Sequence, residues 1–249
     1  MLLADLRVCS REDNRLGIIG ACTIQVFHLL AGRLKQETRE SQYRLNRIAW
    51  REYKKKIPGR YLENQPALTG FLYGVAGKNA CKIFFKGLPL TAARNSCEVI
   101  ATYNALLALG DEKSFPEVLY EYSGNGICFN GIFGTDPLAI YKYFKDQGYE
   151  VTEYMGRKIE TLKDEDDGGV YIYTAFNRGY NPFHMVHTLC ITKEEGSYRV
   201  HNGFIEKNPY PDPLTALKAY NGGASRTIYV LKIKKRSGDM AVDDGSRIK

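Results

Sequence analysis

The chain contains few of the residues that characterise metalloproteins, disulfide-rich domains or membrane proteins. Its 249 residues include six cysteines and four histidines. The cysteines follow no metal-ligand spacing and form no dense disulfide framework, at positions 9, 22, 81, 97, 128 and 190. The apolar segment 16–32 is short for a membrane span and is interrupted by Gln25 and His28. We therefore expect reduced thiols, no metal, no cofactor and no transmembrane segment.

The sequence also lacks a recognisable secretory leader, an internal repeat and a low-complexity tract, which favours a cytoplasmic protein. With 44% hydrophobic and 12% aromatic residues, the chain can bury a sizeable core. We predict a basic N-terminal helical extension over residues 1–60, one globular domain over 61–235 and a flexible tail over 236–249.

Basic residues are concentrated in one short segment. Residues 33–60 hold ten basic and three acidic side chains, a net charge of +7 that equals the formal charge of the whole chain. Apolar residues at helical spacing predict one or two amphipathic helices between residues 22 and 56. A solvated helix face is the simplest interpretation. The functional alternatives are an acidic partner protein or an anionic surface, and no nucleic-acid motif accompanies the segment.

A candidate nucleophile lies at the start of a predicted helix over residues 95–110. Asn95 is a suitable cap, Glu98 completes a variant of the capping box, and Gly110 provides a stop. Apolar residues follow at three- and four-residue spacing, namely Val99, Ile100, Tyr103, Leu106 and Leu107. Cys97 would lie in the first turn, where unpaired amides and the helix dipole favour a thiolate. The alternative is that Cys97 is a small core residue.

A candidate base and its orienting group lie on a predicted hairpin. Its strand-like segments are residues 186–192 and 198–202. A loop of two or four residues pairs Lys193 with Tyr198 and places His187 and Asn202 on one face as diagonal neighbours. The side-chain oxygen of Asn202 would then fix the tautomer of the His187 ring, which leaves the other ring nitrogen to accept the thiol proton.

A loop of three or five residues would shift this register by one and bring His201 to the face of His187 instead. In the favoured register, His184 and His201 lie with Cys190 on the opposite face. A zinc site built from His184, His187, Cys190 and His201 would need ligands on both faces of one strand, so tetrahedral geometry fails.

The order of thiol, imidazole and amide resembles the papain-like cysteine peptidases, an α+β fold with a helical half and an antiparallel sheet. The similarity is greatest to the bacterial peptidases that remove double-glycine leader peptides from bacteriocin precursors. A short helix at 115–122, a glycine-punctuated loop at 123–134, a helix at 135–146 and the strand beginning at Gly148 resemble the segment that follows the family's nucleophile. The resemblance extends over residues 87–234.

One position departs from the family pattern. The family usually has a glutamine six residues before the nucleophile, where it donates to the oxyanion, and this chain has Thr91. Thr91 or Asn95 would have to join the backbone amide of Cys97 as oxyanion donors. The loop before His187 would overhang the cleft, which makes Asn177, Tyr180 and Phe183 candidate substrate contacts.

The expected function is cleavage of a peptide or protein substrate through Cys97, His187 and Asn202. Two alternatives remain open at this point. The same site could serve an acyltransferase or a deamidase, or the chain could be a catalytically inactive relative that acts as a binding module, which the Thr91 departure favours.

Overall fold

The computed structural model describes residues 22, 25–57, 61–75, 90–111, 113–165, 168–176, 186–203, 209–220 and 227–236. The predicted tail beyond residue 236 lies outside the described residues.

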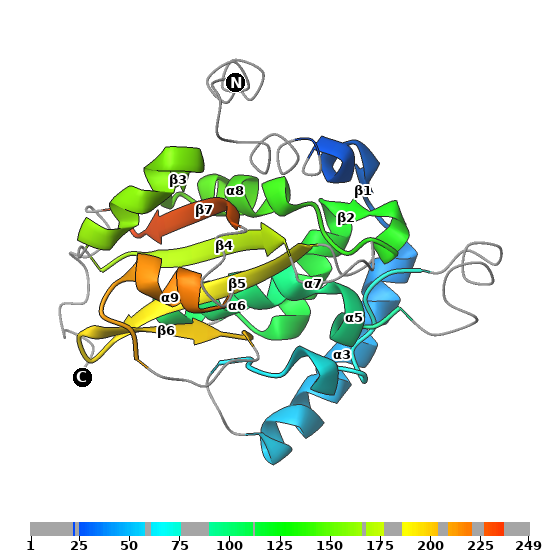
Figure 1. Ribbon diagram of the computed structural model, residues 1–249. Coiled ribbons are helices and arrows are strands. Elements are labelled where there is room, and N and C mark those ends of the chain that lie inside the picture. The colour runs from blue at the N-terminus through cyan, green and yellow to red at the C-terminus, as the bar shows by residue number, and fades with distance from the viewer. Residues whose placement is uncertain are drawn as a thin grey trace, which may run out of the picture.

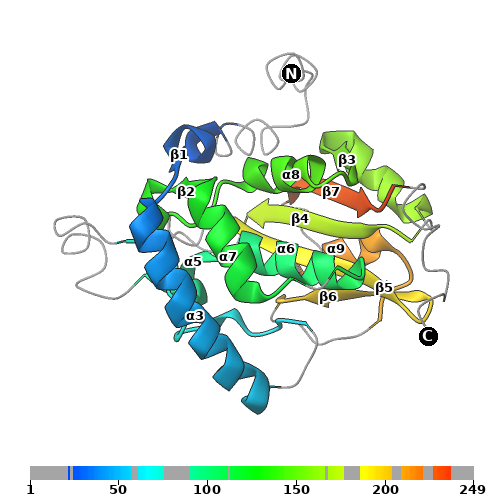
Figure 2. The ribbon, with the colours of Figure 1, turned by 180° about the vertical axis from the view of Figure 1, so that it is seen from behind.

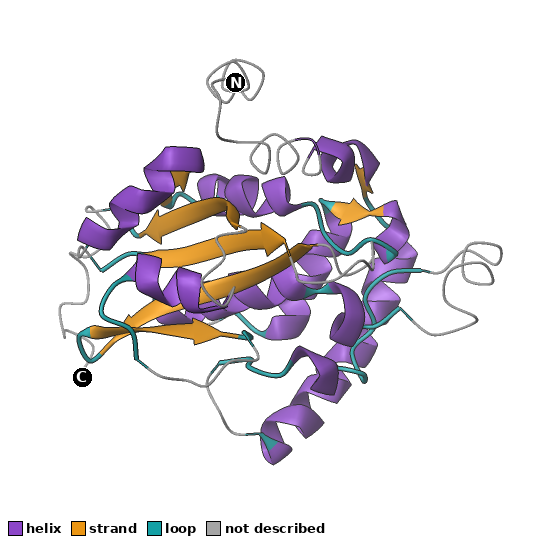
Figure 3. Ribbon diagram, viewed as in Figure 1, coloured by secondary structure: helices purple, strands orange, loops and turns teal. Residues whose placement is uncertain are grey.

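An antiparallel sheet of five strands forms the centre of an α+β fold (Figures 1 and 3). Its strands, in spatial order, are β3 (Glu150–Tyr154), β7 (Thr227–Lys234), β4 (Val170–Phe176), β5 (Val186–Glu194) and β6 (Ser197–His201). A separate ribbon pairs β1 (Ala31–Gly32) with β2 (Ile127–Cys128). The predicted α+β class is confirmed, and the strands predicted over 186–192 and 198–202 are present with small shifts of their ends.

Helices cover both faces of the sheet. Figure 2 shows α6 and α7 in front of the sheet, whereas α9 crosses the opposite face in Figure 1. The α-helices are α3 (Gln36–Lys56), α5 (Ala92–Asn95), α6 (Cys97–Ala108), α7 (Phe115–Gly124), α8 (Pro137–Asp146) and α9 (Pro213–Tyr220), and the 3-10 helices are η2 (Gln65–Ala67), η3 (Phe129–Gly131) and η4 (Gly156–Asp164). The sheet is therefore buried between two helical layers.

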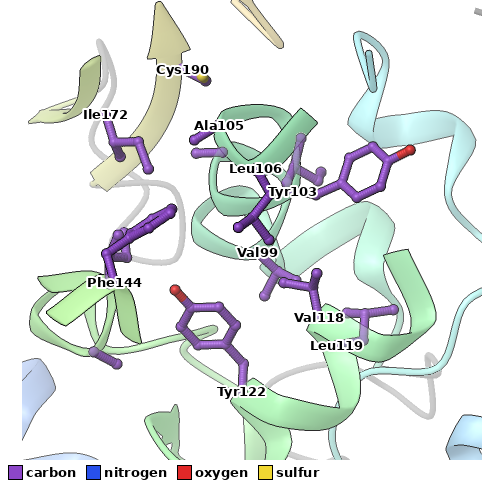
Figure 4. Close-up of a cluster of buried hydrophobic side chains, with 14 of the residues drawn as sticks. Val99, Tyr103, Ala105, Leu106, Val118, Leu119, Tyr122, Phe144, Ile172 and Cys190 are labelled. Carbon is purple, nitrogen blue, oxygen red and sulfur yellow. The ribbon is translucent and has the colours of Figure 1, made fainter. Parts of the chain in front are cut away.

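Alternating side chains of each strand enter two different hydrophobic clusters. On β4, Ile172 packs with α6, α7 and α8, while Tyr171 and Tyr173 pack with α9 and η4. Figure 4 shows the first cluster, in which Leu106 of α6 lies among side chains of neighbouring helices and the sheet. This two-residue period is what a strand buried on both faces requires.

Helix α6 is almost entirely buried, from Cys97 to Leu107. Its C-terminal end follows the prediction: Gly110 has φ +79°, and the Asp111 amide donates to the Leu106 carbonyl oxygen at 2.9 Å. Its start differs, because Asn95 ends α5 and Ser96 occupies the cap position without a side-chain cap bond. The predicted capping roles of Asn95 and Glu98 are therefore wrong, since the chain inserts a separate short helix before Cys97.

The predicted helical segment 22–56 is divided into two parts. Residues 25–30 form the first helical part and are followed by β1. The second part is α3, which ends at Lys56. The outer face of α3 exposes most of its basic residues, whereas the Trp50 ring lies 5.6 Å from the Tyr103 ring and 6.0 Å from the Phe115 ring. Part of the predicted extension therefore packs on the same hydrophobic core as α6 and α7.

Candidate active site

The hairpin that carries the candidate base has the favoured register. Lys193 pairs with Tyr198 and Cys190 pairs with His201. The two-residue turn consists of Glu195 and Gly196, with φ values of 49° and 82°, the positive angles of a tight hairpin turn. This part of the sequence-based prediction is confirmed, and it directs His187 to the face opposite Cys190.

Asn202 contacts His187 through its backbone and not through its side chain. The chain leaves β6 after His201, and Asn202 has φ +63°, in the left-handed region that Asn tolerates better than most residues. Its carbonyl oxygen lies 3.0 Å from His187 Nε2. Because a carbonyl oxygen only accepts hydrogen bonds, Nε2 carries the hydrogen of a neutral ring and Nδ1 is the unprotonated nitrogen. The backbone carbonyl of Asn202 therefore fixes the tautomer of His187, and not the side-chain oxygen as predicted.

The Asn202 side chain instead binds a residue far away in the sequence. Its Oδ1 atom accepts from the Gln65 backbone N–H at 3.1 Å, and its Nδ2 donates to Gln65 Oε1 at 3.3 Å. The Glu63 carboxylate accepts from the Asn202 backbone N–H at 3.0 Å and from His201 Nδ1 at 2.8 Å. These bonds hold Asn202 in the conformation that aims its carbonyl at His187.

Cys97 begins α6 and packs against β5 at the residue next to His187. The Cys97 side chain is buried, and the Thr188 backbone donates a hydrogen bond to it. The Thr188 hydroxyl in turn donates to Glu98 Oε1 at 3.4 Å. The structure therefore brings Cys97, His187 and Asn202 to one end of β5, with Cys97 on the α6 side of the strand and His187 on the α9 side.

The electrostatic environment of Cys97 differs from the predicted one. Burial raises the pKa of the Cys97 thiol well above its usual value, and the negative charge of Glu98 raises it further. The hydrogen bond from the Thr188 backbone lowers it, but by less. The helix start alone does not produce a thiolate, because desolvation and a neighbouring carboxylate dominate. The predicted preference for a thiolate in the resting protein is wrong.

Tyr220, at the end of α9, is a neighbour of this site. Its ring centroid lies 5.9 Å from that of His187. The pKa of Tyr220 is raised to about 12, first by burial and then by the charge of Cys97. Tyr220 therefore lies near both the candidate base and the candidate nucleophile.

The two predicted oxyanion donors occupy structural positions. Asn95 is buried, and its Nδ2 donates to the carbonyl oxygens of Tyr73 and Gly131. Both amide hydrogens are therefore used, and Asn95 has none left for an oxyanion. Thr91 is also buried, precedes α5, and forms an isolated antiparallel bridge with Leu72. The predicted substrate contacts Asn177, Tyr180 and Phe183 lie outside the described residues.

Sequence reasoning did not find Glu63, Gln65 or the effect of the Glu98 charge on the pKa of the Cys97 thiol. Gln65 is separated from Asn202 by 137 positions, so no local pattern links the two. Glu98 did carry a signal, because an acidic residue in an otherwise apolar helix next to a candidate nucleophile is unusual. The capping-box interpretation of Glu98 does not account for this signal.

Within the described part of the chain, no three His, Cys, Asp or Glu side chains come together in a way that could hold a metal ion. Among the same residues, no helix has both the length and the apolar character needed to cross a membrane. Comparisons with models of protein families, with curated proteins and with solved structures found no match. Function therefore has to be inferred from the site itself.

Proposed function

We propose that this chain is a cysteine peptidase of papain-like architecture, with Cys97 as nucleophile, His187 as proton acceptor and Asn202 as the group that orients His187. The observation that carries the proposal is the contact between His187 Nε2 and the Asn202 carbonyl oxygen at 3.0 Å. This contact makes Nδ1 the basic nitrogen of a neutral ring. The residue that follows His187 on β5 is Thr188, whose backbone bonds the Cys97 thiol.

The arrangement of helix and sheet also supports the proposal. Cys97 is the first residue of a buried helix, and that helix packs directly on the strand that carries His187. This resembles the papain-like order of a nucleophile at a helix start and a base on an antiparallel sheet. Only three positions carry the chemistry, so the support comes from their placement and not from overall similarity.

The raised pKa of Cys97 determines when the thiol loses its proton. A neutral thiol in the resting protein means that its proton leaves as the sulfur attacks the carbonyl carbon of the substrate. The proposal requires His187 to take this proton at the end of β5, where the α6 and α9 sides of the strand meet, and to give it to the leaving amine, which produces a thioester on Cys97. Water, deprotonated by the same imidazole, then hydrolyses the thioester and restores the thiol.

The test is cleavage of a mixed peptide library, with products identified by mass spectrometry. Cys97→Ala and His187→Ala should each lower the cleavage rate by at least about a hundredfold, because each removes a group that takes part in the chemistry. Cys22→Ser is the matched control, since Cys22 is an exposed free thiol. Cleavage that survives in Cys97→Ala would refute the proposal.

One observation favours a second candidate, the binding module. A thiol whose pKa is raised by burial and by Glu98 is a poor nucleophile unless a substrate changes its surroundings. If the wild-type protein cleaves no member of the library but retains particular peptides in a pull-down, and Cys97→Ala retains them equally well, the binding module is the correct function.

A further inference from the structure

Glu98 is a buried carboxyl group in direct contact with the candidate nucleophile. Its residue is 5% exposed, and the Cys97 thiol donates to Glu98 Oε2 at 3.2 Å. The other carboxyl oxygen, Oε1, accepts from the Thr188 hydroxyl at 3.4 Å, and that hydroxyl lies 3.1 Å from the Thr174 hydroxyl. Glu98 therefore lies between α6 and the sheet and bonds to groups on both.

The charged and titratable groups around Glu98 do not offset its charge. Burial raises the pKa of Glu98, and Asp136, just before α8, adds a smaller increase. Asp136 is itself bonded to His28 at 2.8 Å. Burial raises the pKa of Tyr73, Cys128 and Tyr229, and the charge of Glu98 raises each of them further. These three groups stay neutral near neutral pH, so a second negative charge at Cys97 would be added to the charges of Glu98 and Asp136.

We propose that Glu98 controls the proton of the nucleophile: its carboxylate holds the Cys97 thiol protonated at rest, and neutralising Glu98 releases the thiol for reaction. The inference deepens the proposed function, because it concerns the regulation of that same sulfur. Glu98 is a positioning residue here, since it acts on Cys97 and not on the substrate.

The physical basis is that the Cys97 and Glu98 pair tolerates one negative charge more readily than two. When Glu98 is ionised, loss of the thiol proton would place two like charges about one hydrogen bond apart in a desolvated site. When Glu98 is neutral, that repulsion disappears. Burial raises the pKa of Glu98 to about 7, so its charge changes near neutral pH and responds to a ligand that alters its solvation.

The first experiment measures alkylation of Cys97 by iodoacetamide from pH 6 to pH 10 in the folded full-length protein. Peptide mass spectrometry follows the Cys97 adduct, so other cysteines do not interfere. Glu98→Gln should react at least about tenfold faster than the wild type at pH 8, because a pKa lowered by one unit gives tenfold more thiolate at a pH below the midpoint. Glu160→Gln, at an exposed carboxylate paired with Lys218, is the matched control and should match the wild type.

An alkylation rate in Glu98→Gln that equals or falls below the wild-type rate would overturn the inference. Peptide cleavage is not measured here, so a missing peptidase activity and a missing Glu98 effect are distinguishable results. Faster alkylation without cleavage would keep the inference about the thiol and reject the peptidase.

A second measurement uses the wild-type side chain at position 98, in case Glu98→Gln does not fold. The infrared S–H stretching band of Cys97 is isolated as the difference between wild type and Cys97→Ala. This band should move to lower frequency as the pH rises through about 7, because an ionised Glu98 accepts a stronger hydrogen bond from the thiol. A band that keeps its frequency from pH 5 to pH 9 would overturn the inference.

Discussion

His187 Nε2 lies 3.0 Å from the backbone carbonyl oxygen of Asn202, which has φ +63°. The imidazole is therefore oriented by the main chain at a residue in the left-handed region, and the Asn202 side chain contributes by fixing that residue to Gln65. A group that orients through its backbone responds differently to substitution from one that orients through its side chain. Position 202 should be sensitive to backbone conformation before it is sensitive to side-chain chemistry.

Substitutions at Asn202 separate these two roles. Asn202→Gly keeps the carbonyl and readily adopts positive φ, so cleavage should stay within about tenfold of the wild type, a change of about 1.4 kcal/mol in the barrier. Asn202→Val is disfavoured at positive φ and should move the carbonyl away from the ring. Nitrogen NMR of His187 should show the hydrogen on Nε2 in the Gly variant and lose that preference in the Val variant. Equal losses in both variants would assign the role to the side chain.

The buried carboxyl of Glu98 makes folding stability depend on pH. Its pKa is about 7 in the folded protein, against 4.5 for an ordinary exposed glutamate. The folded state therefore holds this proton more tightly than the unfolded state, and the contribution is fully present below the unfolded pKa and lost as the pH rises through about 7. Between pH 4.5 and about 7, the free energy of unfolding of the wild type should fall by about 3 kcal/mol relative to that of Glu98→Gln.

Urea unfolding of the two proteins at pH 4.5, 6 and 8 measures this difference. The comparison between variants cancels the contributions of other titrating groups, because only position 98 differs. A stability difference that stays constant over this range would mean that folding does not raise the pKa of Glu98.

The elements that sequence reasoning predicted well are those specified by local patterns. The 3.6-residue period and Gly110 define α6, and the two-residue period with Glu195 and Gly196 defines the hairpin and its register. Both signals come from residues close together in the sequence. The placement of His187 and the C-terminal end of α6 followed from these signals.

The contacts that decide the chemistry were not predictable in this way. Gln65 and Asn202 meet across 137 positions, and Asn95 uses its amide hydrogens on carbonyls from two other segments. Whether Asn202 presents its carbonyl or its carboxamide depends on one backbone angle beyond the end of β6. The raised pKa of Cys97 depends on how deeply α6 is buried, whereas helix position by itself suggested the opposite direction.

The Glu63 carboxylate should be important for stability at the end of β6. It accepts from His201 Nδ1 at 2.8 Å and from the Asn202 backbone at 3.0 Å. Glu63→Gln removes the charge and places an amide NH₂ group, itself a donor, against either His201 Nδ1 or the Asn202 backbone N–H. The lost hydrogen bond should lower the free energy of unfolding by about 1–3 kcal/mol. Guanidinium unfolding measures the loss, and Glu160→Gln on the surface should change stability by less than about 0.5 kcal/mol. A loss no larger than that of Glu160→Gln would show that this carboxylate is not needed.

The segment that precedes Cys97 is held by a close approach at Gly134. Gly134 has φ +76°, and a Cβ atom there would lie 2.9 Å from the Asn95 carbonyl oxygen. Gly148 also has positive φ, +87°, but a Cβ atom there would meet nothing within 4 Å. Both Gly→Ala variants should lose about 1–2 kcal/mol from backbone strain. Gly134→Ala should lose about 1–3 kcal/mol more, because it also pushes on the backbone at Asn95.

The two variants also differ in their expected effect on the site. Gly134→Ala displaces the chain two residues before Cys97, so iodoacetamide should modify Cys97 at a different rate from the wild type under folding conditions. Gly148→Ala strains only the backbone at residue 148, which is far from Cys97 in the sequence. It should leave the alkylation rate of Cys97 unchanged. If thermal unfolding and Cys97 alkylation are the same in both variants, the contact between Gly134 and Asn95 does not position the nucleophile.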